Sequence, residues 1–215
     1  MAYSDYTLEK AVDKLEIKIE ENANLFKEIP EAEIPLLLRL NFENEFAFST
    51  NSEKARSEML IAPILNEIFK GKPGVPRRFT IFSGENFDVD KDLDLKGLAD
   101  FLICLTNTKF LIQAPIIAVA ESKRNTPEDG LGQCVSELFA AALFNKRKNN
   151  ENKIIEKLFG ISTNGNDWIF AEYWVNDNKF IYDPVQYSIR ELPRIIGILS
   201  FMRDEALRMY DKPNS

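Results

Sequence analysis

Hydrophobic and polar residues follow two periods along the chain, one typical of helices and one typical of strands. Apolar side chains recur every three or four positions over residues 7–28, which predicts an amphipathic helix closed by Pro30. The spacing predicts a second helix over 52–69, with Ser52 as its N-cap and a kink at Pro63. The front of the chain is therefore expected to be helical.

The middle of the chain changes to short apolar runs that predict strands. These runs cover 78–83, 97–106 and 110–123, the last interrupted near Pro115. The centres of the second and third runs are continuously apolar, as expected for central strands covered on both faces. An acidic, turn-rich loop joins the first two runs and is expected to be solvated.

A helix, further strands and a final helix complete the predicted order. Thr126 and Pro127 give a clear helix start, and the pattern continues to about residue 145. Gly130 and Gly132 early in this helix indicate a close backbone approach, with substrate and a neighbouring element both open as the partner. Further strands are predicted over 158–163, 168–175 and 179–182, and an amphipathic helix over 188–209. Residues 34–48 fit neither period and receive no assignment.

This order predicts an α/β fold with a central mixed sheet between helices. A length of 215 residues suits one domain with a good core. We expect a single domain over 1–215, with an N-terminal helical extension (1–50), a core (51–185) and a C-terminal helix (186–215).

The absence of histidine narrows the possible chemistry. With no histidine in the sequence, Ser-His-Asp and Cys-His catalysis, imidazole-bound zinc and a histidine general base are excluded. Any catalysis must use carboxylates, lysines, hydroxyls or a bound metal. The net charge is −7, and residues 1–58 carry 13 acids against 7 bases, so the remainder is nearly neutral and could carry a local basic face.

The first residues and the longest apolar runs bear on location. No run approaches the roughly 18 apolar residues that span a bilayer, and the polar, acidic start is unlike a secretory signal. A cytoplasmic protein without membrane contact is expected.

Charged residues interrupt two of the predicted core strands. Asp100 lies inside the apolar run LADFLICL, and Glu121 and Lys123 end the next run two residues apart. Side chains at positions i and i+2 of a strand share a face, so Glu121 and Lys123 project together. If the two strands are neighbours, Asp100 meets them, and two carboxylates converge beside one ammonium.

Such a set could hold Mg²⁺, which prefers oxygen ligands and is usually bound by one or two carboxylates plus water. The metal would activate a phosphodiester for hydrolysis, and the lysine would position or deprotonate the attacking water. Two plainer interpretations stay open. Glu121 and Lys123 could form a surface ion pair, and Asp100 could be a hydrogen-bonded structural aspartate.

The segments GLADFLI (97–103) and IIAVAESK (116–123) resemble the PD-(D/E)xK nuclease superfamily. Within it they are most similar to the N-terminal nuclease domain of type I restriction endonuclease motor subunits and to Mrr-like nucleases. FGISTNGNDWIF (159–170) resembles the strand–turn–strand of that group, in which a Thr-Asn-Gly turn precedes a tryptophan. Ala99 stands where the motif has proline. No GxxxxGK[ST] phosphate loop is present, so a stand-alone nuclease domain or a component of a larger assembly is expected.

The resemblance implies a restriction-endonuclease-like α/β/α sandwich and a role for each matching residue. It implies that Asp100 and Glu121 bind Mg²⁺ or Mn²⁺ together with the backbone carbonyl of Ser122. It implies that Lys123 is the catalytic lysine.

Two further residues match less directly. Glu58 resembles the acidic residue that the preceding helix turns toward the site, although a solvent-facing glutamate fits the position equally well. Helical spacing supports the first interpretation, because Glu58 shares one predicted helical face with apolar residues: Ile61, Ala62, Leu65 and Ile68. Gln133, with Glu137 one turn later, resembles the glutamine contributed by the following helix, and a polar residue without a role is the alternative.

The resemblance implies DNA cleavage, and basic residues supply candidate phosphate contacts: Lys72, Arg77, Arg78 and Arg124. A homodimer or a larger restriction or defence assembly is the expected partner. The alternative function is a catalytically inactive module of this fold that binds nucleic acid or a protein partner.

Overall fold

The computed structural model describes residues 2–43, 49–71, 78–148 and 155–211, and eight strands within them form one mixed sheet. The strand order is β1-β7-β6-β5-β4-β3-β2, and β8 pairs with β6. β1 runs parallel to β7 and β4 runs parallel to β5, whereas the other pairs are antiparallel. The strands are β1 (Lys18–Glu21), β2 (Thr80–Asn86), β3 (Leu98–Cys104), β4 (Ile116–Ser122), β5 (Lys157–Thr163), β6 (Asp167–Trp174), β7 (Lys179–Tyr182) and β8 (Tyr187–Ser188).

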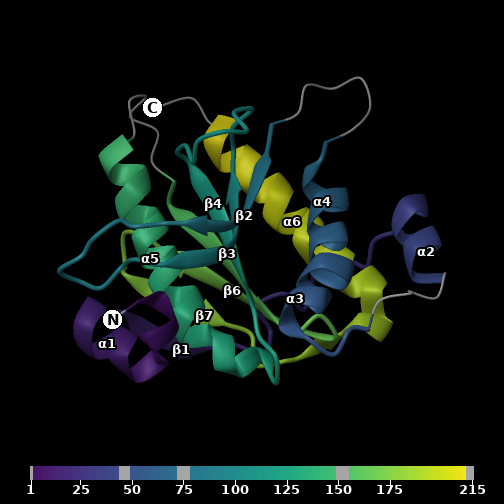
Figure 1. Cartoon of the computed structure of the whole chain (residues 1–215), viewed down its shortest axis with the longest axis horizontal. Helices are drawn as coiled ribbons and strands as arrows, with labels where there is room; N and C mark the ends of the chain where they lie inside the picture. Colours follow the sequence, from purple (N-terminus) through teal and green to yellow (C-terminus); the bar gives the residue numbers. More distant parts are fainter. Residues whose placement is uncertain (1, 44–48, 72–77, 149–154, 212–215) are drawn as a thin grey trace.

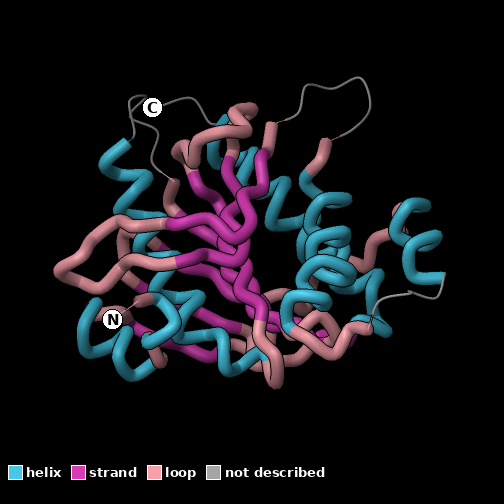
Figure 2. Tube along the Cα trace, in the orientation of Figure 1, coloured by secondary structure: helices cyan, strands magenta, loops and turns pink. Residues whose placement is uncertain are grey.

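Helices cover both faces of this sheet, as Figures 1 and 2 show. α1 and α5 lie against one face, and α4 and α6 lie against the other with α2 beyond α4. The α-helices are α1 (Leu8–Leu15), α2 (Leu36–Glu43), α3 (Glu53–Arg56), α4 (Ala62–Phe69), α5 (Leu131–Lys148) and α6 (Leu192–Asp211). Shorter helical turns are η1 (Tyr3–Asp5), the π-helical η2 (Ser57–Ile61), η3 (Pro127–Gly130) and η4 (Ile189–Glu191). The predicted α/β class with helices on both faces of a mixed sheet is confirmed.

The two central parallel strands are buried along their whole length. All seven positions of β4 and all seven of β5 are buried. Alternate β4 side chains enter different cores, because Ala118 and Ala120 pack with α4 and α6 while Val119 packs with α1 and α5. The period-2 alternation therefore turns Glu121, two residues after Val119, toward α5.

The N-terminal region differs from the predicted helix over 7–28. α1 ends at Leu15, Glu16 adopts a left-handed φ of 54°, and β1 then extends the sheet. The cause is distant in sequence, since the Asn178 side-chain amide donates to the carbonyls of Leu15 and Glu16 at 3.0 Å. These bonds satisfy carbonyls that a helix end leaves without partners.

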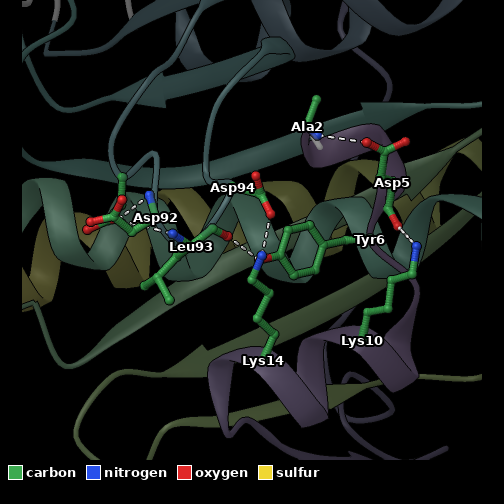
Figure 3. Close-up of polar contacts among 9 residues, drawn as sticks. Ala2, Asp5, Tyr6, Lys10, Lys14, Asp92, Leu93 and Asp94 are labelled. Atoms are coloured by element: carbon green, nitrogen blue, oxygen red, sulfur yellow. Dashed lines mark hydrogen bonds and ion pairs between the residues drawn. The ribbon is translucent and has the colours of Figure 1, made fainter.

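The acidic loop before β3 is also less solvated than expected. Tyr6 donates its hydroxyl hydrogen bond to the carbonyl of Leu93, and Lys14 forms an ion pair with Asp94 (Figure 3). Tyr3 is buried and donates to the carbonyl of Phe87 at 2.7 Å. The N-terminal segment therefore belongs to the core on the α5 face.

The other predicted elements match with small shifts. The strand expected over 110–123 begins only at Ile116, directly after the cis Ala114–Pro115 peptide bond. The unassigned stretch 34–48 contains α2, and its residues 44–48 lie outside the described part of the chain. No helix among the described residues is both long and apolar enough to cross a membrane.

Candidate active site

Asp100 and Glu121 lie on neighbouring strands, as the nuclease prediction requires. β3 and β4 pair antiparallel, and Phe101 lies opposite Ala120. One residue further along this register, Asp100 and Glu121 come opposite each other, where side chains on the same face are about 5 Å apart at Cβ. The two acidic residues therefore meet at the end of β4.

Glu121 and Lys123 form a close ion pair at this point. The Lys123 Nζ atom lies 2.7 Å from Glu121 Oε1, and the two side chains are 23% and 2% exposed. The backbone N–H of Lys123 donates to the Thr163 carbonyl at 2.8 Å, which continues the β4–β5 ladder past Ser122. The lysine thus retains an opening to solvent while the glutamate is enclosed.

The half-buried Asp100 is held in place by the backbone of the next strand. Its Oδ2 atom accepts the Ser122 N–H at 2.8 Å. On the neighbouring strand β2, Gly84 lies between the residue pairs Ser83–Phe101 and Glu85–Ala99, and its φ is +66°. A Cβ atom at Gly84 would meet nothing within 4 Å, so the space beside this edge of the site is open.

The helical segment after β4 brings Gln133 and Glu137 to the site. The Lys123 ammonium donates to Gln133 Oε1 at 2.9 Å, and Gln133 Nε2 donates to Glu137 Oε1 at 2.9 Å. Gly130 permits this approach, because a Cβ atom there would lie 2.2 Å from Ser162 Oγ and 3.2 Å from Glu121 Cγ. Gly132 packs instead against the backbone of Tyr6 and Thr7, so the two glycines contact opposite neighbours.

The charges of this cluster perturb one another. Burial raises the pKa of Asp100, although the Ser122 N–H and the Lys123 charge act against it. Burial, reinforced by the charges of Glu137 and Asp100, holds the pKa of Glu121 well above its ordinary value. Burial raises the pKa of Glu137 to about 8. Burial alone would lower the pKa of Lys123, but the Glu121 carboxylate outweighs it and the net shift is upward.

Asp100, Glu121 and Glu137 thus surround a single ammonium, and this arrangement favours the binding of a further cation. Glu121 Oε2 is buried and has no hydrogen-bond partner among the described residues. The described residues contain no group of three or more Asp, Glu, Cys or His side chains arranged to hold a metal. Two carboxylates with water and a backbone carbonyl suffice for Mg²⁺, so Asp100, Glu121 and the Ser122 carbonyl fit that ion by donor type.

Among the described residues, Glu58 pairs with Lys54 and not with the Glu121–Lys123 pair. The π-helical turn η2, in which the Ala62 N–H donates to the Ser57 carbonyl, lies just before Pro63, which falls in the first turn of α4. The Glu58 side chain is 63% exposed and its carboxylate lies 3.8 Å from Lys54 on the same helical segment. Of the helix residues, Glu53 is the one whose charge raises the pKa of Lys123. The wider turn changes the helical phase on which the Glu58 prediction rested.

The structure describes two of the four predicted DNA-contacting residues, Arg78 and Arg124, and these two lie near opposite ends of the central strands. Lys72 and Arg77 lie outside the described residues. Arg78 precedes the β2 residue that pairs with Cys104, at the far end of β3 from Asp100, and it forms a bidentate pair with Asp211 at 2.7 Å. Arg124 is exposed directly after Lys123.

The Thr-Asn-Gly turn braces the loop that follows Lys123. Asn164 Nδ2 donates to the Asn125 carbonyl at 2.7 Å. Arg56 Nη1, which the sequence did not single out, donates to the Arg124 carbonyl at 2.9 Å and to the Asn164 carbonyl at 3.4 Å. Only the arginine's general tendency to bind carbonyl groups at loops could have suggested this role.

Comparison with known proteins adds no relative. No family model matches the chain, no curated protein matches it, and no solved structure matches it.

Proposed function

We propose that this protein hydrolyses phosphodiester bonds in DNA with the help of a bound Mg²⁺ or Mn²⁺ ion. One observation supports the proposal above all: Asp100 and Glu121 lie on adjacent strands, and the Lys123 ammonium lies 2.7 Å from the Glu121 carboxylate. The resemblance to PD-(D/E)xK nucleases supports DNA as the substrate and partner.

The residues divide the work by their chemistry. Asp100, Glu121 and the Ser122 carbonyl would hold the ion, which when bound polarises a phosphodiester oxygen and lowers the pKa of a bound water. Lys123 keeps its proton at neutral pH, because its pKa is raised. It therefore suits holding the attacking water and stabilising negative charge on the phosphate better than abstracting a proton.

The test compares DNA cleavage by wild type, Lys123→Ala and Lys146→Ala, with plasmid and linear DNA in Mg²⁺ or Mn²⁺. Lys146 is an exposed residue near the end of α5, so its removal makes the same charge change away from the cluster. We expect Lys123→Ala to lower the cleavage rate by roughly 10²- to 10⁴-fold. Lys146→Ala should cut like wild type. Equal rates for wild type and Lys123→Ala would refute the assignment.

A second candidate is an inactive module of this fold that binds nucleic acid or a protein partner. It is favoured by the closed contacts of the cluster, since the Lys123 ammonium is already bonded to Glu121 and Gln133. Calorimetric titration with Mn²⁺ separates the two. Binding that is lost in Asp100→Asn supports the nuclease, whereas the absence of both binding and cleavage supports the module.

A further inference from the structure

Glu137 is an ionisable residue in an unusual place. Its side chain is fully buried in α5, between Cys134 and Leu138, which pack in the core on that face. Glu137 Oε1 accepts one hydrogen bond, and Glu137 Oε2 has no partner among the described residues. Burying a carboxyl group this way costs free energy that a leucine would not. Its presence therefore calls for a specific role.

The role follows from the direction of the hydrogen bonds. An ammonium only donates, so Lys123 needs the oxygen end of the Gln133 amide. The amide nitrogen must then donate elsewhere in a buried position, and Glu137 Oε1 accepts that bond at 2.9 Å. Without this acceptor, the amide would either leave a buried N–H unbonded or turn its nitrogen toward the ammonium, donor against donor. Glu137 thus fixes which end of Gln133 faces Lys123.

We propose that Glu137 is a positioning residue that, through Gln133, holds the Lys123 ammonium beside Glu121 in the orientation used for catalysis. Its effect on turnover rests on the proposed nuclease function. Its effect on the Gln133 amide does not. Glu137 itself is two hydrogen bonds away from the lysine and acts only through the amide.

Three variants test this in the full chain: Glu137→Leu, Glu137→Gln and Gln133→Leu. Glu137→Leu removes the acceptor, whereas Glu137→Gln removes the acidic group but can still present an oxygen to Gln133. We expect Glu137→Leu to lower the turnover of Mn²⁺-dependent DNA cleavage by about 10- to 100-fold with little change in KM. Glu137→Gln should stay within about 3-fold of wild type. The double variant Gln133→Leu/Glu137→Leu should fall no lower than Gln133→Leu, because both substitutions break one chain of bonds.

A readout without cleavage separates this inference from the nuclease proposal. In ¹⁵N–¹H spectra, the Gln133 side-chain amide protons should be protected from exchange in wild type and Glu137→Gln, and lose protection in Glu137→Leu. If wild type cuts no DNA but shows this protection pattern, the nuclease function is refuted and the orienting role of Glu137 is supported. Unchanged protection in Glu137→Leu, or a double variant whose losses simply multiply, would overturn the inference. If Glu137→Leu does not fold, Glu137→Met removes the same acceptor with an unbranched side chain.

Discussion

Two lysine–glutamate pairs in this protein have the same length and different surroundings. The Nζ–Oε1 distance is 2.7 Å both for Lys123–Glu121 and for Lys157–Glu172. Lys157 begins β5, whereas the Lys123 pair lies beside the end of β5, about 20 Å away along the strand. The two pairs also face different helices, α6 for Lys157 and α5 for Lys123.

The Lys157 pair is complete in itself. Glu172 Oε1 accepts from Lys157, and Glu172 Oε2 accepts from Trp174 Nε1 at 3.0 Å. The Lys157 ammonium also lies 5.1 to 5.8 Å from three aromatic ring centres, those of Phe159, Trp174 and Phe201. Such contacts stabilise a desolvated cation.

The Lys123 pair, in contrast, lies among more carboxyl groups than one ammonium can bind. Glu121 Oε2 has no hydrogen-bond partner in the described chain, and Asp100 and Glu137 add two more carboxyl groups nearby. A buried ion pair therefore says little about function until the other hydrogen bonds and charges around its two groups are known. A pair with every oxygen bonded stabilises the fold, whereas a pair with an unmet oxygen and excess charge suits a cation.

The largest expected effect comes from removing the Lys157 ammonium. Lys157→Met leaves the Glu172 carboxylate buried without its counter-charge, so we expect the free energy of unfolding to fall by about 3 to 5 kcal/mol. Lys123→Met should cost much less, because Glu121, whose pKa is already raised, can take up a proton. Urea denaturation of both variants in EDTA measures the difference.

The double variant Lys157→Met/Glu172→Leu is the control for this comparison. Removing both charges should recover most of the stability lost in Lys157→Met, since no buried charge remains. A cost for Lys123→Met as large as that for Lys157→Met would contradict the distinction between the two pairs.

A smaller effect of opposite sign is expected for Glu121→Gln. The folded protein holds the pKa of Glu121 well above its ordinary value, so near pH 7.5 the carboxyl destabilises the fold relative to the unfolded chain. The amide avoids this penalty, and the free energy of unfolding in EDTA should rise by on the order of 1 kcal/mol. Mn²⁺ should then stabilise wild type but not the variant.

Glu20→Gln is the matched control, because Glu20 forms a half-exposed pair with Lys179 at the sheet edge. Its unfolding free energy should change by no more than about 0.5 kcal/mol. A loss of stability in Glu121→Gln would show that the ionised carboxylate supports the fold, as Glu172 does.

The core of the fold could be predicted because its signals are local. The apolar runs that form β3, β4 and β5 and the Thr126–Pro127 start before α5 are visible in a few consecutive residues. The end of α1 is not, because it depends on Asn178, more than 160 residues away. β1 joins the sheet only after that helix stops.

The site shows the same division. The alternation of strand side chains predicted that Glu121 and Lys123 share a face, and the pairing of β3 with β4 confirms that the two strands are neighbours. The Glu58 prediction assumed one unbroken helical phase, which the π-helical turn before Pro63 removes. The complete burial of Glu137 depends on how α5 packs against the sheet, and the sequence alone carries no sign of it.

The last expected effect concerns pH. The pKa of Glu137 is raised to about 8, mainly by burial, from the ordinary value that the unfolded chain restores. Between about pH 4.5 and 8 the folded protein therefore binds more protons than the unfolded chain, and the free energy of unfolding must fall as pH rises. One carboxyl contributes a slope of at most about 1.4 kcal/mol per pH unit.

Urea unfolding of wild type and Glu137→Gln in EDTA, from pH 5 to pH 8, measures this slope. In Glu137→Gln, the free energy of unfolding should fall less steeply as pH rises. The remaining fall is the part due to Glu121, whose pKa is shifted in the same direction. Lys157→Met/Glu172→Leu, which alters the other pair, should keep the wild-type slope. Identical slopes in wild type and Glu137→Gln would mean that Glu137 is ionised in the folded protein, and the excess charge at the site would then be larger, not smaller, than its burial implies.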